Sequence, residues 1–235
     1  IVLAGPGSGK TRVLTYRIAY LISVLNVPAY NILAVTFTNK AAKQMGERVT
    51  QLIGPHAEGI WLGTFHAICG RILRREADLL PVNKNFVIFD TDDQEALMKQ
   101  ILRDNNLDEK LYKPASILSA ISNSKNDLIG PENYAVKDFR DEQVKRLYVL
   151  YQQRLAQNNA MDFDDMLVYT NQLLEIYPNV RETYGHKFEQ LLVDEFQDTN
   201  LSQYAILKQL SWQHRNLYVV GDEDQSIYRW RGADY

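Results

Sequence analysis

Residues 1–11, IVLAGPGSGKT, decide the fold of this chain. The apolar run 1–4 ends at a glycine, which predicts a short buried strand. Residues 5–11 match the pattern G-x-x-x-x-G-K-[ST], whose glycine-rich loop turns backbone N–H groups towards an anion at the start of a helix. The lysine of this pattern reaches the outer phosphates of a nucleotide, and the hydroxyl residue ligates Mg²⁺. The stretch therefore predicts a nucleoside triphosphate site.

The alternative for this stretch is an ordinary glycine-rich turn. The helical period of apolar residues over 12–25 argues against it, because a phosphate loop lies between a strand and a helix. We expect the following residues to contact the phosphates: Gly5, Pro6, Gly7, Ser8, Gly9, Lys10 and Thr11.

The composition is that of a globular protein without a general attraction to nucleic acid. The chain has 235 residues, 46% of them hydrophobic, and a formal net charge of −3, so any nucleic-acid contact must come from local patches. Its single cysteine excludes a disulfide within the chain and a cysteine zinc site, which suits a cytoplasmic protein. No apolar stretch has membrane-spanning length and no signal peptide is visible. Since the chain begins with Ile inside a strand, we expect a piece of a longer protein.

Short apolar runs separated by helical patterns predict an α/β domain with a parallel sheet flanked by helices. The expected strands are 1–4, 31–37, 59–65, 86–89, 190–193 and 217–220, and the expected helices are 12–25, 41–53, 66–75, 164–177 and 200–210. Residues 91–159 show almost no strand signal and begin with a capping box at 91–94. We therefore predict a discontinuous P-loop NTPase domain, residues 1–90 and 160–235, interrupted by a helical insertion at 91–159.

Acidic and amide side chains follow the expected strands at their carboxyl ends, where ligands of open parallel sheets bind. Asp194 and Glu195 follow four apolar residues. Beside a phosphate loop, the first suits Mg²⁺ and the second suits a base for the attacking water. The alternative is a strand-end turn with two solvated carboxylates. Gln197 and Gln225 could sense a γ-phosphate without adding charge, or could be surface glutamines.

Aromatic residues at strand ends and in loops form a second group of candidates, because such rings stack on unpaired bases. They are Phe37, Phe65, Phe163, Tyr228 and Trp230. Core packing is an equal alternative for the first two. The position of Trp230 between Arg229 and Arg231 favours nucleic-acid contact instead.

Three further features have simpler structural interpretations. A lone histidine such as His66 is usually a satisfied structural residue, with motor coupling as the alternative. Cys69 fits an apolar helix face as inert core. Asp162, Asp164 and Asp165 match no metal-binding loop, and Asp162 is more simply a helix N-cap.

Six stretches carry a resemblance to a known family: 4–11 (AGPGSGKT), 36–42 (TFTNKAA), 62–66 (LGTFH), 161–166 (MDFDDM), 193–200 (VDEFQDTN) and 220–234 (VGDEDQSIYRWRGAD). In this order they resemble the motifs of UvrD/PcrA/Rep-type superfamily 1 DNA helicases. The match covers the α/β part almost end to end, whereas the helical insertion matches only in place and size.

The resemblance implies a RecA-like motor domain that uses ATP and Mg²⁺ to move 3′ to 5′ along single-stranded DNA. Its implied partners are single-stranded DNA and DNA junctions. It implies catalytic roles for Lys10, Glu195 and Gln225, and metal binding by Thr11 and Asp194. Arg12 would lie near the base, and Gln197 would join the nucleotide site. The implied DNA contacts are Phe37, Thr38, Asn39, Phe65, His66, Phe163, Tyr228, Trp230 and Arg231.

Two parts of such helicases lie outside this sequence: an upstream glutamine segment that reads adenine, and a second RecA-like domain that supplies arginines. Arginine fingers contribute roughly 10³–10⁵ in rate in related enzymes, so we expect the chain alone to be a weak ATPase at best. The alternatives are a passive nucleotide- or single-strand-binding module, another P-loop enzyme such as a kinase, and the motor part of a helicase–nuclease.

Overall fold

The computed structural model describes residues 1–3, 5 and 9–222. The chain forms two compact units. The sheet unit comprises Ile1–Cys69 together with the chain from Asn171 onward, and the helical unit comprises Gly70–Thr170. Each unit is described by itself below.

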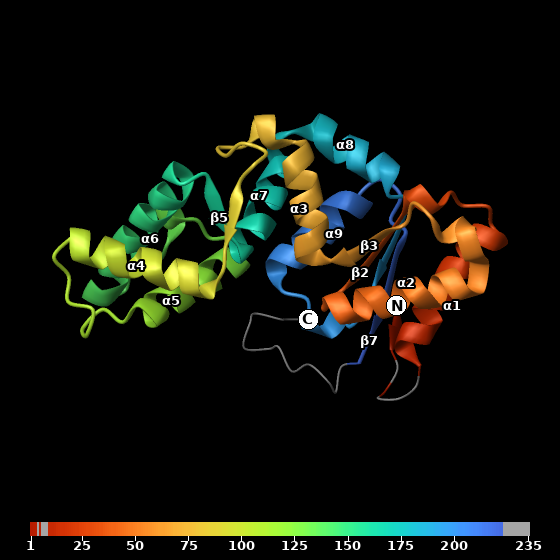
Figure 1. The fold of residues 1–235 in the computed structure, drawn as a ribbon, viewed down its shortest axis with the longest axis horizontal. Helices are drawn as coiled ribbons and strands as arrows, with labels where there is room; N and C mark the ends of the chain where they lie inside the picture. Colours follow the sequence, from red (N-terminus) through yellow and green to blue (C-terminus); the bar gives the residue numbers. More distant parts are fainter. Residues whose placement is uncertain (4, 6–8, 223–235) are drawn as a thin grey trace. The chain divides into compact units, whose positions relative to one another are not determined.

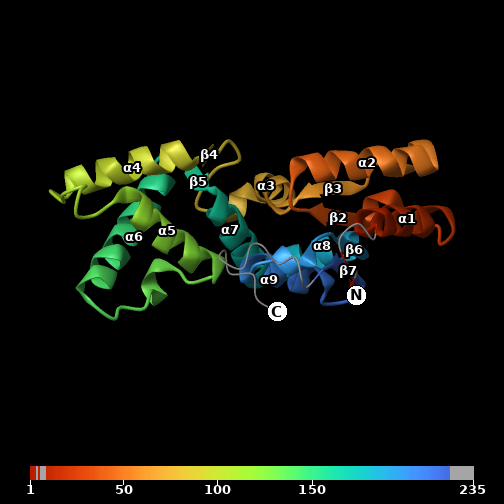
Figure 2. The ribbon, with the colours of Figure 1, turned by 90° about the horizontal axis from the view of Figure 1, so that it is seen from below.

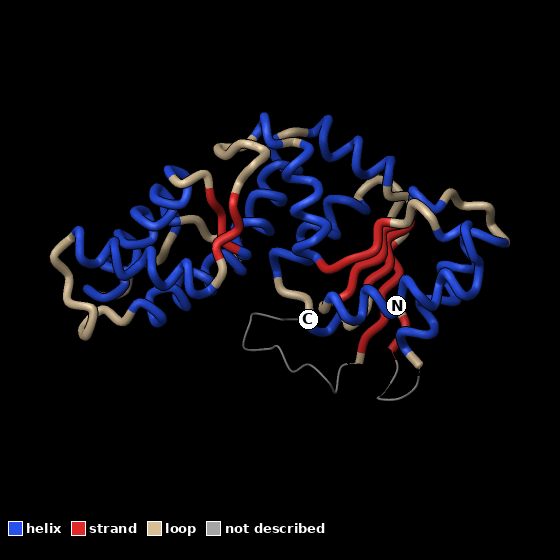
Figure 3. Tube along the Cα trace, viewed as in Figure 1, coloured by secondary structure: helices blue, strands red, loops and turns tan. Residues whose placement is uncertain are grey.

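The sheet unit contains a five-stranded parallel sheet, drawn in red in Figure 3. Its strands, in spatial order, are β1 (Val2–Leu3), β7 (Leu217–Gly221), β6 (Gln190–Val193), β2 (Ile32–Thr36) and β3 (Trp61–Thr64). Val193 pairs with Val35 on one side and with Val219 on the other. This register brings the carboxyl ends of the strands to one edge of the sheet.

Helices α1 (Lys10–Ser23) and α2 (Asn39–Ile53) cover one face of this sheet. Figure 1 shows α9 (Leu201–Ser211) on the side of the sheet away from them. The core between the sheet and its first two helices includes Leu14, Ile18, Leu21, Ile32, Ala34, Met45, Val49, Leu192 and Val220. Helix α8 (Pro178–Lys187) also belongs to this unit, whereas α3 (Phe65–Arg75) and α7 (Phe163–Ile176) each contribute residues to both units.

The helical unit is built from α4 (Thr91–Asp104), α5 (Pro114–Asn126) and α6 (Phe139–Gln157), which are grouped together in Figure 2. Their shared core includes Met98, Ile101, Leu102, Ile121, Leu147 and Tyr151, all at most 1% exposed. Strands β4 (Val87–Phe89) and β5 (Ala160–Asp162) pair in parallel as a separate two-stranded sheet.

The predicted fold class, an α/β parallel sheet flanked by helices, is confirmed. Three local details and the bounds of the helical part differ from the sequence expectation. The expected strand 86–89 forms β4 outside the large sheet, and the capping box of α4 uses Asp90 and Asp93 instead of Thr91. Pro178 begins a further helix, because proline is well tolerated in the first turn. The helical unit extends beyond the expected insertion 91–159 at both ends.

Leu192→Ala should strongly destabilise the sheet unit. Leu192 lies in the central strand β6 and is 1% exposed, so the substitution leaves a cavity in the core. We expect a loss of about 2–5 kcal/mol in the free energy of unfolding, measured by urea denaturation. The control is Leu201→Ala, at a side chain 49% exposed on α9, which should change stability by less than about 0.5 kcal/mol. Equal losses would contradict this account of the core.

Candidate nucleotide-binding site

The N-cap of α1 provides no side-chain acceptor for the first turn of the helix. The N-cap residue Gly9 has φ +88°, a left-handed conformation that glycine adopts without a Cβ penalty. Glycine has no side chain to accept hydrogen bonds from the first-turn N–H groups, and such groups at a helix N-terminus suit an anionic ligand. Lys10, the first residue of the helix, is only 8% exposed.

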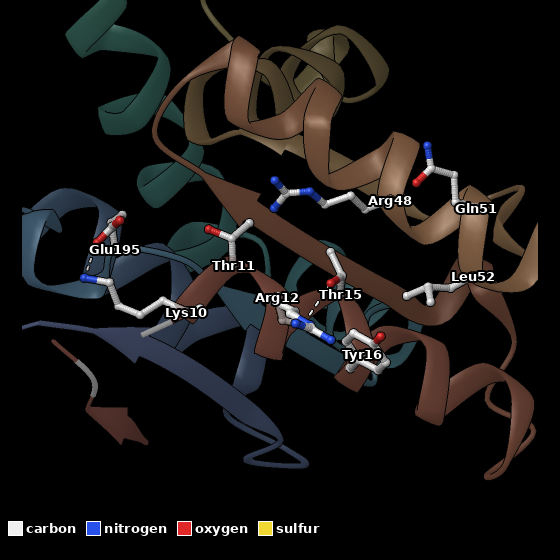
Figure 4. Close-up of a pocket in the computed structure, with 10 residues that line it drawn as sticks. Lys10, Thr11, Arg12, Thr15, Tyr16, Arg48, Gln51, Leu52 and Glu195 are labelled. Atoms are coloured by element: carbon white, nitrogen blue, oxygen red, sulfur yellow. Dashed lines mark hydrogen bonds and ion pairs between the residues drawn. The ribbon is translucent and has the colours of Figure 1, made fainter. Parts of the chain in front are cut away.

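The ammonium of Lys10 lies between two carboxylates from neighbouring strand ends. Its Nζ is 3.4 Å from Glu195 Oε2 and 3.4 Å from Asp222 Oδ2. Figure 4 shows the pairing with Glu195. A largely buried ammonium needs such counter-charges because desolvation of an unpaired ion is costly. The two acids follow β6 and β7, so the sheet register itself supplies the partners of the lysine.

The two predicted metal ligands are in direct contact. Thr11 Oγ1 donates a hydrogen bond to Asp194 Oδ2 at 3.2 Å. Burial, followed by the neighbouring charge of Glu195, raises the pKa of Asp194 above its ordinary value. A hydroxyl and a carboxylate are hard oxygen ligands that fit Mg²⁺, which commonly takes one or two carboxylates and completes its shell with substrate phosphates and water. Among the described residues, no group of three or more His, Cys, Asp or Glu side chains could hold a metal ion.

Glu195 is held in an unusual backbone conformation beside these residues. Its φ of +49° lies in the left-handed region, which residues other than glycine seldom adopt. Residues in such conformations cluster at functional sites. Gln197 donates from Nε2 to Glu195 Oε2 at 2.7 Å and accepts at Oε1 from the backbone N–H of Asp222 at 2.9 Å. Gln197 therefore bridges the ends of β6 and β7, and its contact with a γ-phosphate stays a prediction.

A cavity of about 650 Å³ adjoins Lys10 and Glu195. The Arg12 guanidinium lies over the ring of Tyr16, 5.4 Å from its centre. Figure 4 shows the side chains contributed by α2 on the opposite side of the cavity: Arg48, Gln51 and Leu52. The sequence analysis did not predict that these three side chains line the cavity. Their spacing of three and four residues on α2 indicates a shared helix face, but not what that face lines.

The candidate DNA contacts of the sheet unit differ in accessibility. Phe65 is 3% exposed and packs edge-on against the half-buried Phe37, with ring centres 5.9 Å apart. A ring buried to this extent cannot stack on a base, so Phe65 supports Phe37 instead. Thr38 and Asn39 are exposed at the start of α2, and Thr38 caps that helix by accepting from the N–H of Ala41.

The remaining predicted residues fall into three groups. His66 is half-buried, and Cys69 is buried as expected. Phe163 is 44% exposed and belongs to the helical unit. The following predicted residues lie outside the described part of the chain: Pro6, Gly7, Ser8, Gln225, Tyr228, Trp230 and Arg231.

A parallel sheet whose first helix begins with a largely buried lysine, next to a threonine–aspartate pair, defines a P-loop nucleotide-binding protein. The sequence profile of the UvrD/REP helicase N-terminal domain matches residues 1–235, and the chain belongs to this family. It is 51% identical over its whole length to the ATP-dependent DNA helicase PcrA of Bacillus subtilis, and 50% identical to the PcrA proteins of Staphylococcus aureus and Staphylococcus epidermidis. The chain spans 32% of the length of each of these relatives. Within the described residues, no helix is both long and apolar enough to cross a bilayer.

Gly221→Ala should disturb the bridge made by Gln197. A Cβ at Gly221 would lie 2.8 Å from Gln197 Oε1, so the amide must move away from Asp222 and Glu195. We expect the rate of ATP hydrolysis by the full-length protein to fall at least tenfold. Gly46→Ala is the matched control, because an added Cβ there meets no atom within 4 Å in the middle of α2. An unchanged rate for Gly221→Ala would show that this bridge is dispensable.

Proposed function

We propose that this chain is the first motor domain of an ATP-dependent DNA helicase that moves 3′ to 5′ along single-stranded DNA. The observation that carries the proposal is the meeting of two contacts at one sheet edge: Lys10 pairs with Glu195, and Thr11 bonds to the adjacent Asp194. The membership of the UvrD/REP family and the PcrA relatives support the choice of a DNA motor over another P-loop enzyme.

In this proposal, the phosphates of ATP replace carboxylates as partners of Lys10. The ammonium exchanges Glu195 and Asp222 for the outer phosphates, and the first-turn N–H groups of α1 complete the anion site. Thr11 and Asp194 would hold Mg²⁺, which neutralises phosphate charge. Arg12, stacked on Tyr16, lies on the side proposed for the base.

Release from Lys10 frees the Glu195 carboxylate for catalysis. The hydrogen bond from Gln197 orients the carboxylate without neutralising it. Glu195 then accepts the proton of the water that attacks the γ-phosphate, while Gln225 contacts that phosphate. The arginines that complete such sites would come from a second RecA-like domain, which suits a chain spanning a third of its relatives' length.

The proposed DNA path uses exposed rings and polar groups near strand ends. Phe37, Thr38 and Asn39 contribute from the sheet unit, with Phe65 supporting the first ring and His66 beside it. Phe163, in the helical unit, is proposed as a DNA contact of that unit by itself. By their sequence, Tyr228, Trp230 and Arg231 add two rings and a cation, the combination that stacks on bases and pairs with phosphates.

Glu195→Gln in the full-length protein should retain ATP binding and lose most turnover. The amide keeps the shape of the side chain but cannot accept the proton, and general-base catalysis is worth about 10²–10⁴-fold. Steady-state hydrolysis and binding of a fluorescent ATP analogue measure the two properties separately. Turnover within twofold of the unsubstituted protein would reject Glu195 as the base.

Trp230→Ala should weaken DNA-stimulated hydrolysis more than basal hydrolysis. Stacking of one base on an aromatic side chain contributes about 1–3 kcal/mol, which the substitution removes only when DNA is bound. The measurement is hydrolysis with and without oligo-dT. Equal losses in both conditions would indicate a folding role, and hydrolysis that oligo-dT does not stimulate in the unsubstituted protein would indicate a passive nucleotide-binding module.

A further inference from the structure

The helical unit contains a buried ionic cluster that the proposed ATP chemistry does not use. Lys125, at the end of α5, places its Nζ 2.7 Å from Asp162 Oδ2 and 2.7 Å from Asp165 Oδ1. The three side chains are between 1% and 3% exposed. A fully buried lysine is rare unless it is paired, so these contacts must hold together for the unit to keep its structure.

Every carboxylate oxygen of this cluster has a donor. Tyr151 donates its hydroxyl to Asp162 Oδ2 at 3.0 Å, and Gln152 donates from Nε2 to Asp165 Oδ1 at 2.9 Å. The two remaining oxygens accept backbone N–H groups in a reciprocal pattern, Asp165 N to Asp162 Oδ1 and Asp162 N to Asp165 Oδ2. Asp162 is thus the N-cap of α7, as its sequence position predicts. The cluster is geometrically defined by α5, α6 and the β5–α7 junction.

The charges of the cluster stabilise one another. Burial by itself lowers the pKa of the Lys125 ammonium, but the charges of Asp162 and Asp165 outweigh it and raise that pKa above the ordinary value. Burial and the charge of Asp162 raise the pKa of Asp165 to about 6. At neutral pH the lysine is therefore charged, and losing it would leave two buried carboxylates without a counter-ion.

The cluster fixes the backbone next to an exposed aromatic ring. Phe163 lies directly between the β5 residue Asp162 and the first turn of α7, and its side chain is 44% exposed. Both backbone N–H groups of the reciprocal cap, at 162 and 165, flank Phe163. The backbone on either side of this ring is consequently held by side chains that are themselves buried.

We propose that Lys125 is a positioning residue for single-stranded DNA: by clamping Asp162 and Asp165 it holds the β5–α7 junction in the one conformation that presents Phe163 to a base. This inference rests on the proposed DNA contact of Phe163 and extends it to a residue that touches no DNA. An aromatic ring held in place before binding loses less conformational entropy when a base stacks on it.

A double-mutant cycle tests the proposal in the full-length protein. Phe163→Ala should weaken oligo-dT binding, measured by fluorescence anisotropy, by roughly 5- to 150-fold, the range that base stacking gives. Lys125→Met should weaken binding several-fold when Phe163 is present and by less than twofold in the Phe163→Ala background. Tyr151→Phe, which removes one hydrogen bond to Asp162 and keeps the ion pairs, should give a smaller effect with the same dependence on Phe163.

The matched control is Lys99→Met, which removes a positive charge from the surface of the same unit, where Lys99 pairs with Glu95. It should not couple to Phe163. The positioning role would be overturned if Lys125→Met weakened oligo-dT binding by the same factor with Phe163 present and in the Phe163→Ala background. If Lys125→Met does not fold, Tyr151→Phe is compared in the same way. Either result would leave the DNA contact of Phe163 intact. If Phe163→Ala left the affinity for oligo-dT unchanged, both the DNA contact and the positioning role would be overturned. The proposed ATP-dependent function would stand, because stimulation of hydrolysis by oligo-dT tests it separately.

Discussion

The pairing of one largely buried lysine with two strand-end carboxylates is the interaction on which the site depends. Lys10 is 8% exposed, and its charge is balanced by Glu195 after β6 and Asp222 after β7. Since parallel pairing fixes which strand ends are neighbours, the sheet order β1-β7-β6 determines which acids the lysine meets. Lys10 and these acidic residues, separated by about 180 to 210 residues of chain, form one site for this reason.

The backbone at the same sheet edge is conformationally restricted at Glu195, beside Lys10 and Asp194. Glu195 has a left-handed backbone, and Gln197 ties its carboxylate to the end of β7 through the N–H of Asp222. Strain of this kind persists only where surrounding contacts over-determine it. An ion pair and two hydrogen bonds thus connect Lys10, through Glu195 and Gln197, to Asp222 at the end of β7.

Much of the fold and the phosphate site could be predicted because both depend on local patterns. Strands such as β6 are short apolar runs, and the loop before α1 has a fixed spacing that few other functions require. The remaining features depend on tertiary contacts. Arg48 enters the cavity through the packing of α2 on α1, and nothing local in the sequence marks Lys125 as buried, since lysine is normally exposed. The parallel pairing of β4 with β5 joins segments about 70 residues apart, which no local pattern reports.

The most direct test of this account is the position of the Lys10 ammonium in a crystal structure of the full-length protein with Mg²⁺ and a non-hydrolysable ATP analogue. The account predicts that Nζ leaves Asp222 Oδ2, now 3.4 Å away, and lies about 2.7–3.2 Å from oxygens of the outer phosphates. A bound nucleotide with Lys10 still paired to Glu195 and Asp222 would contradict it.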